Sequence, residues 1–344
     1  MIILELVRKN ILALVPYSTA RDEYTGKLGV FLDANENPYP NSGYNRYPDP
    51  AQRELKEVLA GIKGVPAEQI FVGNGSDEAI DLAFRVFCEP RVDNAIAIAP
   101  SYGMYRVVAA INDVEMREVR LGADFSLSAD AVLGAVDERT KLLFLCSPNN
   151  PSGNLLERSE VERLLEQFHG MVVIDEAYID FADDAGFLPA LDRYPNLIVL
   201  QTLSKAWGLA GLRLGLAFGA REVMDIFARV KYPYNIGVAT QRLVLDRLRG
   251  EGEVRREIAE IKSQRARVTE ALEANPAVEK VFPSDANFVL VRTAEPRRMY
   301  ETLIAKGVIV RDRSRVPGCE GCLRITVGTP AENDILIELL STYR

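Results

Sequence analysis

Four short apolar runs, rich in leucine, isoleucine and valine, determine the fold class expected for this chain. They are KLLFLCS at 141–147, MVVIDE at 171–176, LIVLQT at 197–202 and RLGLAF at 213–218. Runs of this length and composition are typical of strands that are buried on both faces of a sheet. Helical patterns lie between several of them, at 77–87, 159–168 and 222–230. This alternation predicts an α/β fold with a mostly parallel central sheet flanked by helices.

The remaining segments predict a second, smaller domain. With 344 residues, the chain is long enough for about two domains. We place a large domain at 45–235 and a small α+β domain at 236–344, after an N-terminal segment at 1–44 that packs with the small domain. The small domain is expected to contain a long helical stretch at 238–274, strands at 287–292, 308–313 and 323–328, and a final helix. Ligands of such folds bind at the carboxyl ends of strands and between domains.

The charge and composition disfavour several classes of partner. The chain has 41 basic and 49 acidic side chains and a net charge of −8, which argues against general binding to nucleic acids or anionic membranes. No apolar run approaches the roughly 18 residues of a membrane span. Glu5, Arg8 and Lys9 interrupt the N-terminal apolar run, so an amphipathic helix is expected there rather than a signal peptide. The expected compartment is therefore the cytoplasm.

Few histidine and cysteine residues are available for catalysis. His169 is the only histidine, which disfavours Ser-His-Asp, Cys-His and multi-histidine metal chemistry. Cys319 and Cys322 form a single CxxC motif without a second pair of ligands, so we expect reduced thiols and no metal.

Two motifs with anion-binding and turn character lie at the ends of predicted strands. In GNGSDEAI (73–80), the glycines allow close approach to an anion, and Ser76 and Asp77 offer donors at a helix N-terminus. Because Glu78 replaces the third glycine, this is not the dinucleotide-binding pattern, and an N-cap after a tight turn is the alternative. SPNNPSGN (147–154) follows a buried strand and by itself indicates a turn.

Two further motifs carry titratable groups. In VIDEAYIDF (173–181), Asp175 ends an apolar strand, where an unpaired carboxylate is costly and a cationic partner is expected. In QTLSKAWGLAGLRLG (201–215), Lys205 follows a strand and Arg213 lies beyond it. A desolvated lysine near other cations has a lowered pKa, so its amine can act as a nucleophile and form a Schiff base. The alternative is a surface lysine in a loop.

Together, the four motifs match the requirements of a pyridoxal phosphate site. Such a site needs a lysine that captures the aldehyde, a carboxylate for the pyridine nitrogen and donors to the ring hydroxyl. It also needs a phosphate cradle at a helix N-terminus and an aromatic ring stacked on the cofactor. Each of these parts has a candidate at the strand ends of one predicted domain.

The chain resembles the class II pyridoxal-phosphate-dependent aminotransferases of fold type I, and among these the histidinol-phosphate aminotransferase family. The similarity runs nearly end to end. Besides the motifs above, it includes PYSTAR (16–21), LDANENPYP (32–40), NRYPDP (45–50), PSYGMY (100–105) and LRITVGTPAEN (323–333). The departures are small: Trp207 stands where phenylalanine is usual, and Ser101 where threonine is common.

The resemblance implies three catalytic residues and a larger cofactor site. Lys205 would form the Schiff base and move the proton, Asp175 would pair with the pyridine nitrogen, and Tyr178 would bind the ring hydroxyl. The remaining cofactor residues implied are Asn150 on the ring hydroxyl, Tyr102 stacked on the ring, and Gly75, Ser76, Asp77, Thr202, Ser204 and Arg213 around the phosphate.

The resemblance also implies the substrates and a homodimer with shared active sites. The family transfers an amino group reversibly between L-histidinol phosphate and 2-oxoglutarate, in histidine biosynthesis. The residues implied to bind substrate are Tyr17, Asn37, Tyr47, Asn150 and Arg324. Of these, Tyr47 would enter the site of the neighbouring subunit, and the segment 1–44 would contact that partner.

Other functions stay open at this point. An aromatic amino-acid aminotransferase or a threonine-phosphate decarboxylase would keep the same cofactor residues. A hydrolase of another class could use Ser204 activated by Lys205, although adjacent residues at a strand end point in different directions. A non-catalytic cofactor-binding or regulatory protein is disfavoured, since the chain has no DNA-binding extension.

Overall fold

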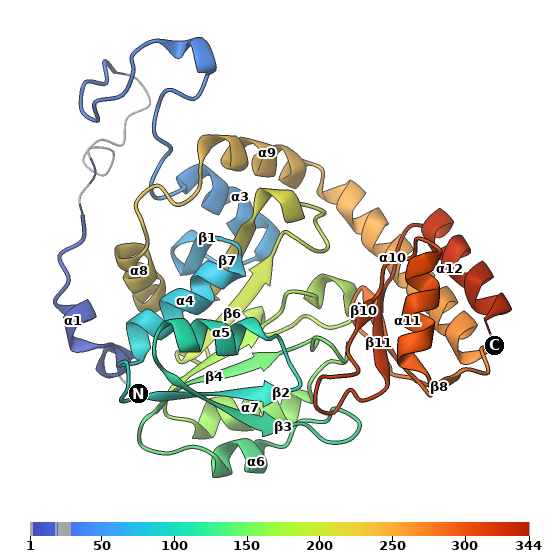
Figure 1. Ribbon diagram of the computed structural model, residues 1–344. Helices are drawn as coiled ribbons and strands as arrows, with labels where there is room; N and C mark the ends of the chain where they lie inside the picture. The colour runs from blue at the N-terminus through green and yellow to red at the C-terminus, as the bar shows by residue number, and fades with distance from the viewer. Residues whose placement is uncertain (1–2, 18, 20–28, 344) are drawn as a thin grey trace.

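The computed structural model describes residues 3–17, 19 and 29–343, and shows a large central sheet with a smaller unit at the carboxyl end of the chain (Figure 1). The large sheet has seven strands in the order β1-β7-β6-β5-β4-β2-β3. They are β1 (Ile70–Asn74), β2 (Asn94–Ala99), β3 (Glu115–Arg120), β4 (Thr140–Cys146), β5 (Met171–Asp175), β6 (Leu197–Thr202) and β7 (Leu214–Gly219). Only β7 runs antiparallel to its neighbours, β1 and β6. The predicted α/β class with a mostly parallel sheet is confirmed.

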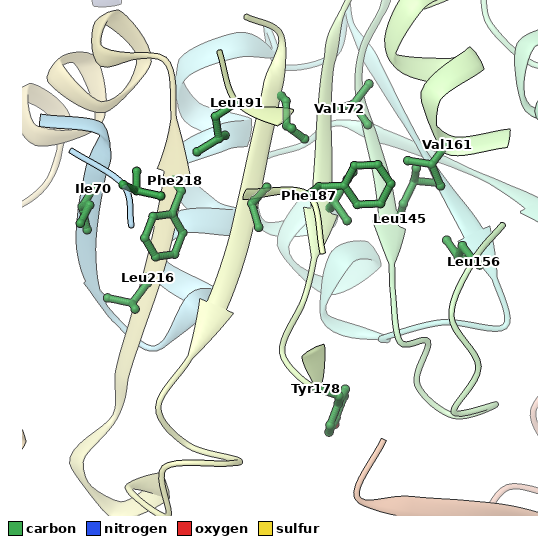
Figure 2. Packing of buried hydrophobic residues seen from close by; sticks show 14 of the residues in the cluster. Ile70, Leu145, Leu156, Val161, Val172, Tyr178, Phe187, Leu191, Leu216 and Phe218 are labelled. Carbon is green, nitrogen blue, oxygen red and sulfur yellow. The ribbon is translucent and has the colours of Figure 1, made fainter. Parts of the chain in front are cut away.

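The strands bury alternate side chains in two separate apolar layers. In β5, Val172 and Ile174 belong to one buried cluster, whereas Met171 and Val173 belong to the other. Successive side chains of a strand point to opposite faces, so β5 is buried on both sides, which explains its unbroken apolar run. Figure 2 shows part of the first layer, with Leu145 and Val172 near Phe187 and with Tyr178 apart from them, past the end of β5.

Helices cover both faces of the large sheet. The first layer includes residues of α3 (Arg53–Lys63), α6 (Ala129–Gly134), α7 (Arg158–Gln167) and α9 (Val238–Arg249). The second includes residues of α1 (Lys9–Leu12), α4 (Ser76–Phe87), α5 (Met104–Ile111) and α8 (Arg221–Val230). Short 3-10 helices lie at Ile3–Leu6, Pro40–Ser42, Ala67–Gln69, Ile179–Phe181, Leu188–Ala190 and Ala210–Leu212. None of the helices among the described residues is long and apolar enough to cross a membrane.

The smaller unit packs helices against a second sheet. Its four strands have the order β10-β11-β9-β8 and are all antiparallel to their neighbours. The elements are α10 (Glu251–Glu273), β8 (Val278–Val281), β9 (Phe288–Thr293), α11 (Pro296–Ala305), β10 (Arg311–Asp312), β11 (Cys322–Thr326) and α12 (Pro330–Thr342). Their apolar side chains, among them Val268, Val291 and Leu336, form a separate buried cluster.

Two expected elements of the carboxyl-terminal region differ from the structure. The predicted helical stretch at 238–274 is two helices, because Gly250 ends α9 and precedes α10. The strand expected at 308–313 is reduced to the two residues of β10. In addition, Val244, Leu248 and Val254 belong to the apolar layer of the large sheet, so α9 and the first turn of α10 pack on the large domain.

The N-terminal residues pack on the large domain. Ile3, Val7 and Ile11 are buried in the layer that contains α4, and the Arg8 guanidinium donates to the Glu89 carboxylate at 3.0 Å. These contacts place 3–12 against the large sheet, whereas the segment 1–44 was expected to pack with the small domain. Residues 18 and 20–28 of that segment, part of the PYSTAR motif included, lie outside the described residues. Its contact with a partner subunit stays a prediction.

Candidate active site

A cavity of about 90 Å³ lies at the carboxyl ends of β4, β5 and β6, beside the amino end of α4. Its lining consists of Ser76, Asp77, Tyr102, Cys146, Asn150, Asp175, Ala177, Tyr178, Thr202, Ser204, Lys205 and Arg213. Because the carboxyl ends of parallel strands meet at one edge of a sheet, motifs far apart in the sequence come together here. All four strand-end motifs singled out from the sequence contribute to this cavity.

Asp175, the last residue of β5, carries a buried carboxylate that accepts two hydrogen bonds. Its Oδ2 accepts from the Tyr105 hydroxyl at 2.8 Å, and its Oδ1 accepts from the Ala177 amide at 3.1 Å. Burial raises the pKa of Asp175 to about 6, although both hydrogen bonds oppose this change. The partner expected from the sequence was a cation, but the protein itself supplies a hydroxyl and an amide.

Lys205 follows β6 in a turn and directs its amine into the same cavity. Its Nζ lies 5.6 Å from the centroid of the Tyr178 ring. Burial lowers the pKa of Lys205, and so does the positive charge of Arg324, while Asp175 acts in the opposite direction. A lowered pKa increases the fraction of the neutral amine, which is the nucleophilic and proton-accepting form.

The amino end of α4 and Arg213 form a cradle for an anion. The helix begins at Ser76 after Gly75, whose φ is 79°. The Arg213 Nη2 lies 3.6 Å from Asp77 Oδ2, and a Cβ added to Gly75 would lie 2.8 Å from that Nη2. Free amide groups and the helix dipole favour negative charge at a helix N-terminus, and a guanidinium adds a charged donor. This arrangement can hold a phosphate group.

A series of hydrogen-bonded polar side chains connects the large domain to the small one. Asn150 Nδ2 donates to the Tyr178 hydroxyl at 3.4 Å, and Arg324 of β11 donates to Asn150 Oδ1. The Tyr178 ring packs edge-on against Phe288 of β9, with their centroids 5.1 Å apart, and the Arg324 guanidinium lies over the same Phe288 ring. Arg324 Nε is buried and has no hydrogen-bond partner among the described residues, so it is available to a ligand.

Of the five predicted substrate residues, only Asn150 lines this cavity within one chain. Arg324 contacts the cavity through its hydrogen bond to Asn150, and the other three lie elsewhere. Tyr17 is 77% exposed, and Asn37 accepts from the Tyr39 amide in an exposed turn. Tyr47 is half exposed and stacks on Tyr234, with ring centroids 4.4 Å apart. A role for these residues in substrate binding stays a prediction.

Comparison with known proteins identifies the family. The sequence profile of the family Aminotransferase class I and II matches residues 25–340. The chain belongs to the class I and II aminotransferases. A histidinol-phosphate aminotransferase of Parabacteroides distasonis is 53% identical to this aminotransferase over 340 residues, which cover 99% of this chain and 98% of the relative. One from Bacteroides fragilis strain YCH46 is also 53% identical and covers 99% of each chain.

Solved structures share the fold of this aminotransferase. The histidinol-phosphate aminotransferase of Clostridium acetobutylicum superposes with a TM-score of 0.80 at 22% identity, covering 87% of this chain and 91% of its own. The L-threonine-O-3-phosphate decarboxylase of Porphyromonas gingivalis gives a TM-score of 0.73 at 25% identity, with 88% and 91% covered. Because these two enzymes are named for different reactions, the fold alone does not decide the substrate.

The cavity of this aminotransferase fits pyridoxal phosphate. Lys205 and the buried Asp175 line one cavity together with the residues of the anion cradle. In the anion cradle, the φ of 79° at Gly75 favours a glycine, and a Cβ there would displace the Arg213 guanidinium from its observed position. The phosphate, ring nitrogen and carbonyl of the cofactor thus each have a chemically suitable group in reach of the same space.

Sequence reasoning missed several residues of the site. Tyr105, Cys146 and Ala177 surround Asp175, and Asn149 is fully buried, where it accepts from the Ser101 hydroxyl at 2.9 Å. One feature of the sequence could have indicated Tyr105. It lies three residues after Tyr102 in PSYGMY, and this spacing places two rings on one side of a helix.

Proposed function

We propose that this protein is a histidinol-phosphate aminotransferase. It would transfer an amino group reversibly between L-histidinol phosphate and 2-oxoglutarate, giving imidazole-acetol phosphate and L-glutamate, as a step of histidine biosynthesis. The observation that carries this proposal is the 53% identity, over nearly the whole chain, to relatives named for this activity. The cavity supports it, because Lys205 and Asp175 lie there with an anion cradle.

Pyridoxal phosphate, when bound, supplies an electrophilic carbonyl and a ring that accepts electron density from the substrate. Lys205 would hold the cofactor through its amine and, once released, carry the proton to and from the substrate Cα. Its lowered pKa suits both tasks, since a general base works best when a substantial fraction is neutral at the working pH.

Other groups would hold the cofactor in one orientation. Asp175 would pair with the ring nitrogen, and Tyr178 and Asn150 would donate to the ring hydroxyl. Tyr102, whose hydroxyl donates to Asp77 Oδ1 at 3.1 Å, would stack on the ring. The phosphate would lie in the cradle formed by the following residues: Gly75, Ser76, Asp77, Thr202, Ser204 and Arg213.

Arg324 would bind the anionic group of each substrate. Its guanidinium donates to Asn150, and its buried Nε has no partner among the described residues, so a bound carboxylate or phosphate would satisfy it. A planar guanidinium can accept either anion in turn, which suits an enzyme that binds two different substrates at one site.

A homodimer with shared sites is part of the same proposal. Val30 and Leu32 are 87% and 86% exposed, and Tyr39 and Tyr232 are also largely exposed. Exposed apolar side chains of this number suit burial by a second copy of the chain. The neighbouring Tyr47 would then reach the partner's cavity. The four free, buried cysteines suit a reducing compartment, in agreement with the expected cytoplasmic location.

The test is a comparison of substrates with the purified protein. We expect turnover of histidinol phosphate with 2-oxoglutarate to exceed that of phenylalanine, and we expect no decarboxylation of threonine phosphate. Borohydride should attach the cofactor covalently at Lys205, as read by peptide mapping. Absence of turnover with histidinol phosphate would refute the substrate assignment. A hydrolase using Ser204 has little support, because the Ser204 amide donates to Thr202 Oγ1 and no hydrogen bond joins Ser204 to Lys205 in the described chain.

A further inference from the structure

Tyr105 is a buried tyrosine that none of the cofactor contacts above uses. It lies in the first turn of α5 and is 1% exposed. Its hydroxyl donates to Asp175 Oδ2 at 2.8 Å, which makes it the only side chain hydrogen-bonded to that carboxylate among the described residues.

Neighbouring rings hold the Tyr105 hydroxyl in place. The Tyr105 ring stacks on Phe144 of β4, with centroids 4.9 Å apart and an interplanar angle of 21°. The edge of Tyr102 meets the same ring at 5.6 Å and 85°. Aromatic packing of this kind restricts both side-chain torsions, so the hydroxyl has one available position. Tyr105 therefore supports two groups that face the cofactor, the carboxylate of Asp175 and the ring of Tyr102.

The hydrogen bond from Tyr105 affects the charge state of Asp175, because that carboxylate is buried. Burial raises the pKa of Asp175, and the Tyr105 hydroxyl is the largest opposing influence, followed by the Ala177 amide. Among nearby charges, Asp77 raises that pKa and Lys205 lowers it. Burial also raises the pKa of Tyr105 well above its usual value, so its hydroxyl keeps its proton and remains a donor. A hydrogen bond to the charged form stabilises an ionised carboxylate against desolvation.

We propose that Tyr105 is a positioning residue of this aminotransferase, which keeps Asp175 ionised and fixed so that the carboxylate can pair with the protonated ring nitrogen of the cofactor. This inference rests on the proposed cofactor role of Asp175. It assigns to Tyr105 no contact with the cofactor or substrate, because its hydroxyl is already directed at Asp175.

The test compares two ligands that differ only at the ring nitrogen. Full-length protein freed of cofactor is titrated with pyridoxal phosphate and with 1-deazapyridoxal phosphate, in which a C–H group replaces the nitrogen. In wild type we expect pyridoxal phosphate to bind more tightly. Tyr105→Phe should weaken its binding about tenfold, equivalent to one unit in the pKa of Asp175, and leave the affinity for the deaza compound unchanged. The kcat should fall with little change in the KM for 2-oxoglutarate.

Two further variants separate this role from general destabilisation. Tyr194→Phe is a matched control, because Tyr194 is also a buried tyrosine whose hydroxyl donates to a carboxylate, that of Glu166 at 3.2 Å. We expect it to change neither affinity. In an Asp175→Asn background, Tyr105→Phe should have no further effect on pyridoxal phosphate binding, since the pair acts as one unit.

The outcomes distinguish this proposal from the one it rests on. Equal weakening of both ligands by Tyr105→Phe, or an undiminished effect in the Asp175→Asn background, would overturn the role of Tyr105. Equal affinity of the wild type for both ligands would instead overturn the pairing of Asp175 with the ring nitrogen. If histidinol phosphate is not turned over but the ligand difference persists, only the substrate assignment fails.

Discussion

Gly215 of β7 lies against the amino end of α4, where there is no room for a side chain. A Cβ at this position would lie 2.0 Å from the Ser76 amide nitrogen and 2.2 Å from the Gly75 carbonyl carbon. Both are backbone atoms, so the contact cannot be relieved by a side-chain rotation. The absence of a side chain at one residue thus sets how closely the anion cradle approaches the sheet.

We therefore expect Gly215→Ala to damage the cradle. Helix α4 must shift away from β7, which should lower the free energy of unfolding by about 1–3 kcal/mol and the affinity for pyridoxal phosphate by about tenfold or more. Urea unfolding and absorbance titration measure the two effects. The control is Gly61→Ala in α3, where a Cβ meets nothing within 4 Å and the helix should gain stability. If Gly215→Ala binds the cofactor as tightly as the control, the cradle does not depend on this contact.

A second prediction at the residue scale concerns the shape of the Arg324 side chain. Lysine keeps the charge but loses the planar fork that contacts Asn150 and lies over Phe288. Arg324→Lys should lower kcat/KM about a hundredfold for both glutamate and histidinol phosphate, with cofactor affinity little changed. Arg298→Lys, on the exposed face of α11, is the control and should retain activity. An effect confined to one of the two substrates would contradict a shared anion site.

At the scale of elements, the sequence predicted the strands that are buried on both faces better than the others. The runs at 197–202 and 171–176 correspond to β6 and β5, with a one-residue difference for β5. The strand β3 was not predicted, because it pairs only with β2 and its sequence EMREVR is mostly charged. The antiparallel direction of β7 could not be predicted from its local amino-acid composition. It depends on how β7 pairs with β1 and β6, which is a property of the whole sheet.

The residues of the site were likewise predicted where the local sequence marks them and missed where their role depends on tertiary packing. Lys205, Asp175 and Asn150 were found because motifs and strand ends mark them. Tyr105 was not, because its role depends on where α5 packs relative to β5, and helix packing is decided by tertiary contacts rather than by the helix's own residues. The same reason explains why the pairing of Asn150 with Arg324, which joins two domains, was not predicted.

The end of β5 carries two successive buried carboxyl groups, which predicts a dependence of stability on pH. Burial raises the pKa of Asp175 from 3.8 to about 6 and that of Glu176 from 4.5 to about 7. Each group therefore ionises more readily in the unfolded state. The stability that each protonated group contributes is fully present below its unfolded pKa and is lost as pH rises through its folded pKa.

We expect Asp175→Asn to become progressively more stable than wild type as pH rises from about 4 to 6, in protein freed of cofactor. Over this range, the difference in the free energy of unfolding between the variant and wild type should change by roughly 3 kcal/mol, because the pKa of Asp175 is shifted by about two units. Urea unfolding across this range measures it, and Glu176→Gln should behave alike up to about pH 7. Asp183→Asn is the control with the opposite sign, since Lys262 lowers the pKa of Asp183. A pH-independent difference for Asp175→Asn would contradict the buried ionised carboxylate.

At the scale of the whole molecule, the turn that holds Asn150 is tied to the small domain. The Asp285 amide donates to the Gly153 carbonyl at 2.7 Å, and Asp285 Oδ2 accepts from the Leu155 amide at 3.0 Å. The small domain also carries Arg324 and Phe288. The cofactor side and the substrate side of the cavity are therefore joined by these hydrogen bonds, and their relative position depends on both domains.

The last prediction tests whether two chains share each site. Lys205→Ala removes the reacting amine, and Tyr47→Ala removes the ring proposed to enter the partner's cavity. Each variant alone should be nearly inactive as a homodimer. If Tyr47 acts in the partner's site, a heterodimer of the two variants contains one site with both residues intact and one site that lacks both. Purified through two different affinity tags, it should have about half of the wild-type activity.

A heterodimer of Lys205→Ala with wild type is the matched control, and it should also have about half of the wild-type activity. If Tyr47 instead acted within its own chain, the heterodimer of the two variants would contain no intact site and would be as inactive as its parents. The stacking of Tyr47 on Tyr234 places the ring on the surface in the single chain, half exposed and outside the cavity that holds Lys205. Restored activity is therefore the expected result.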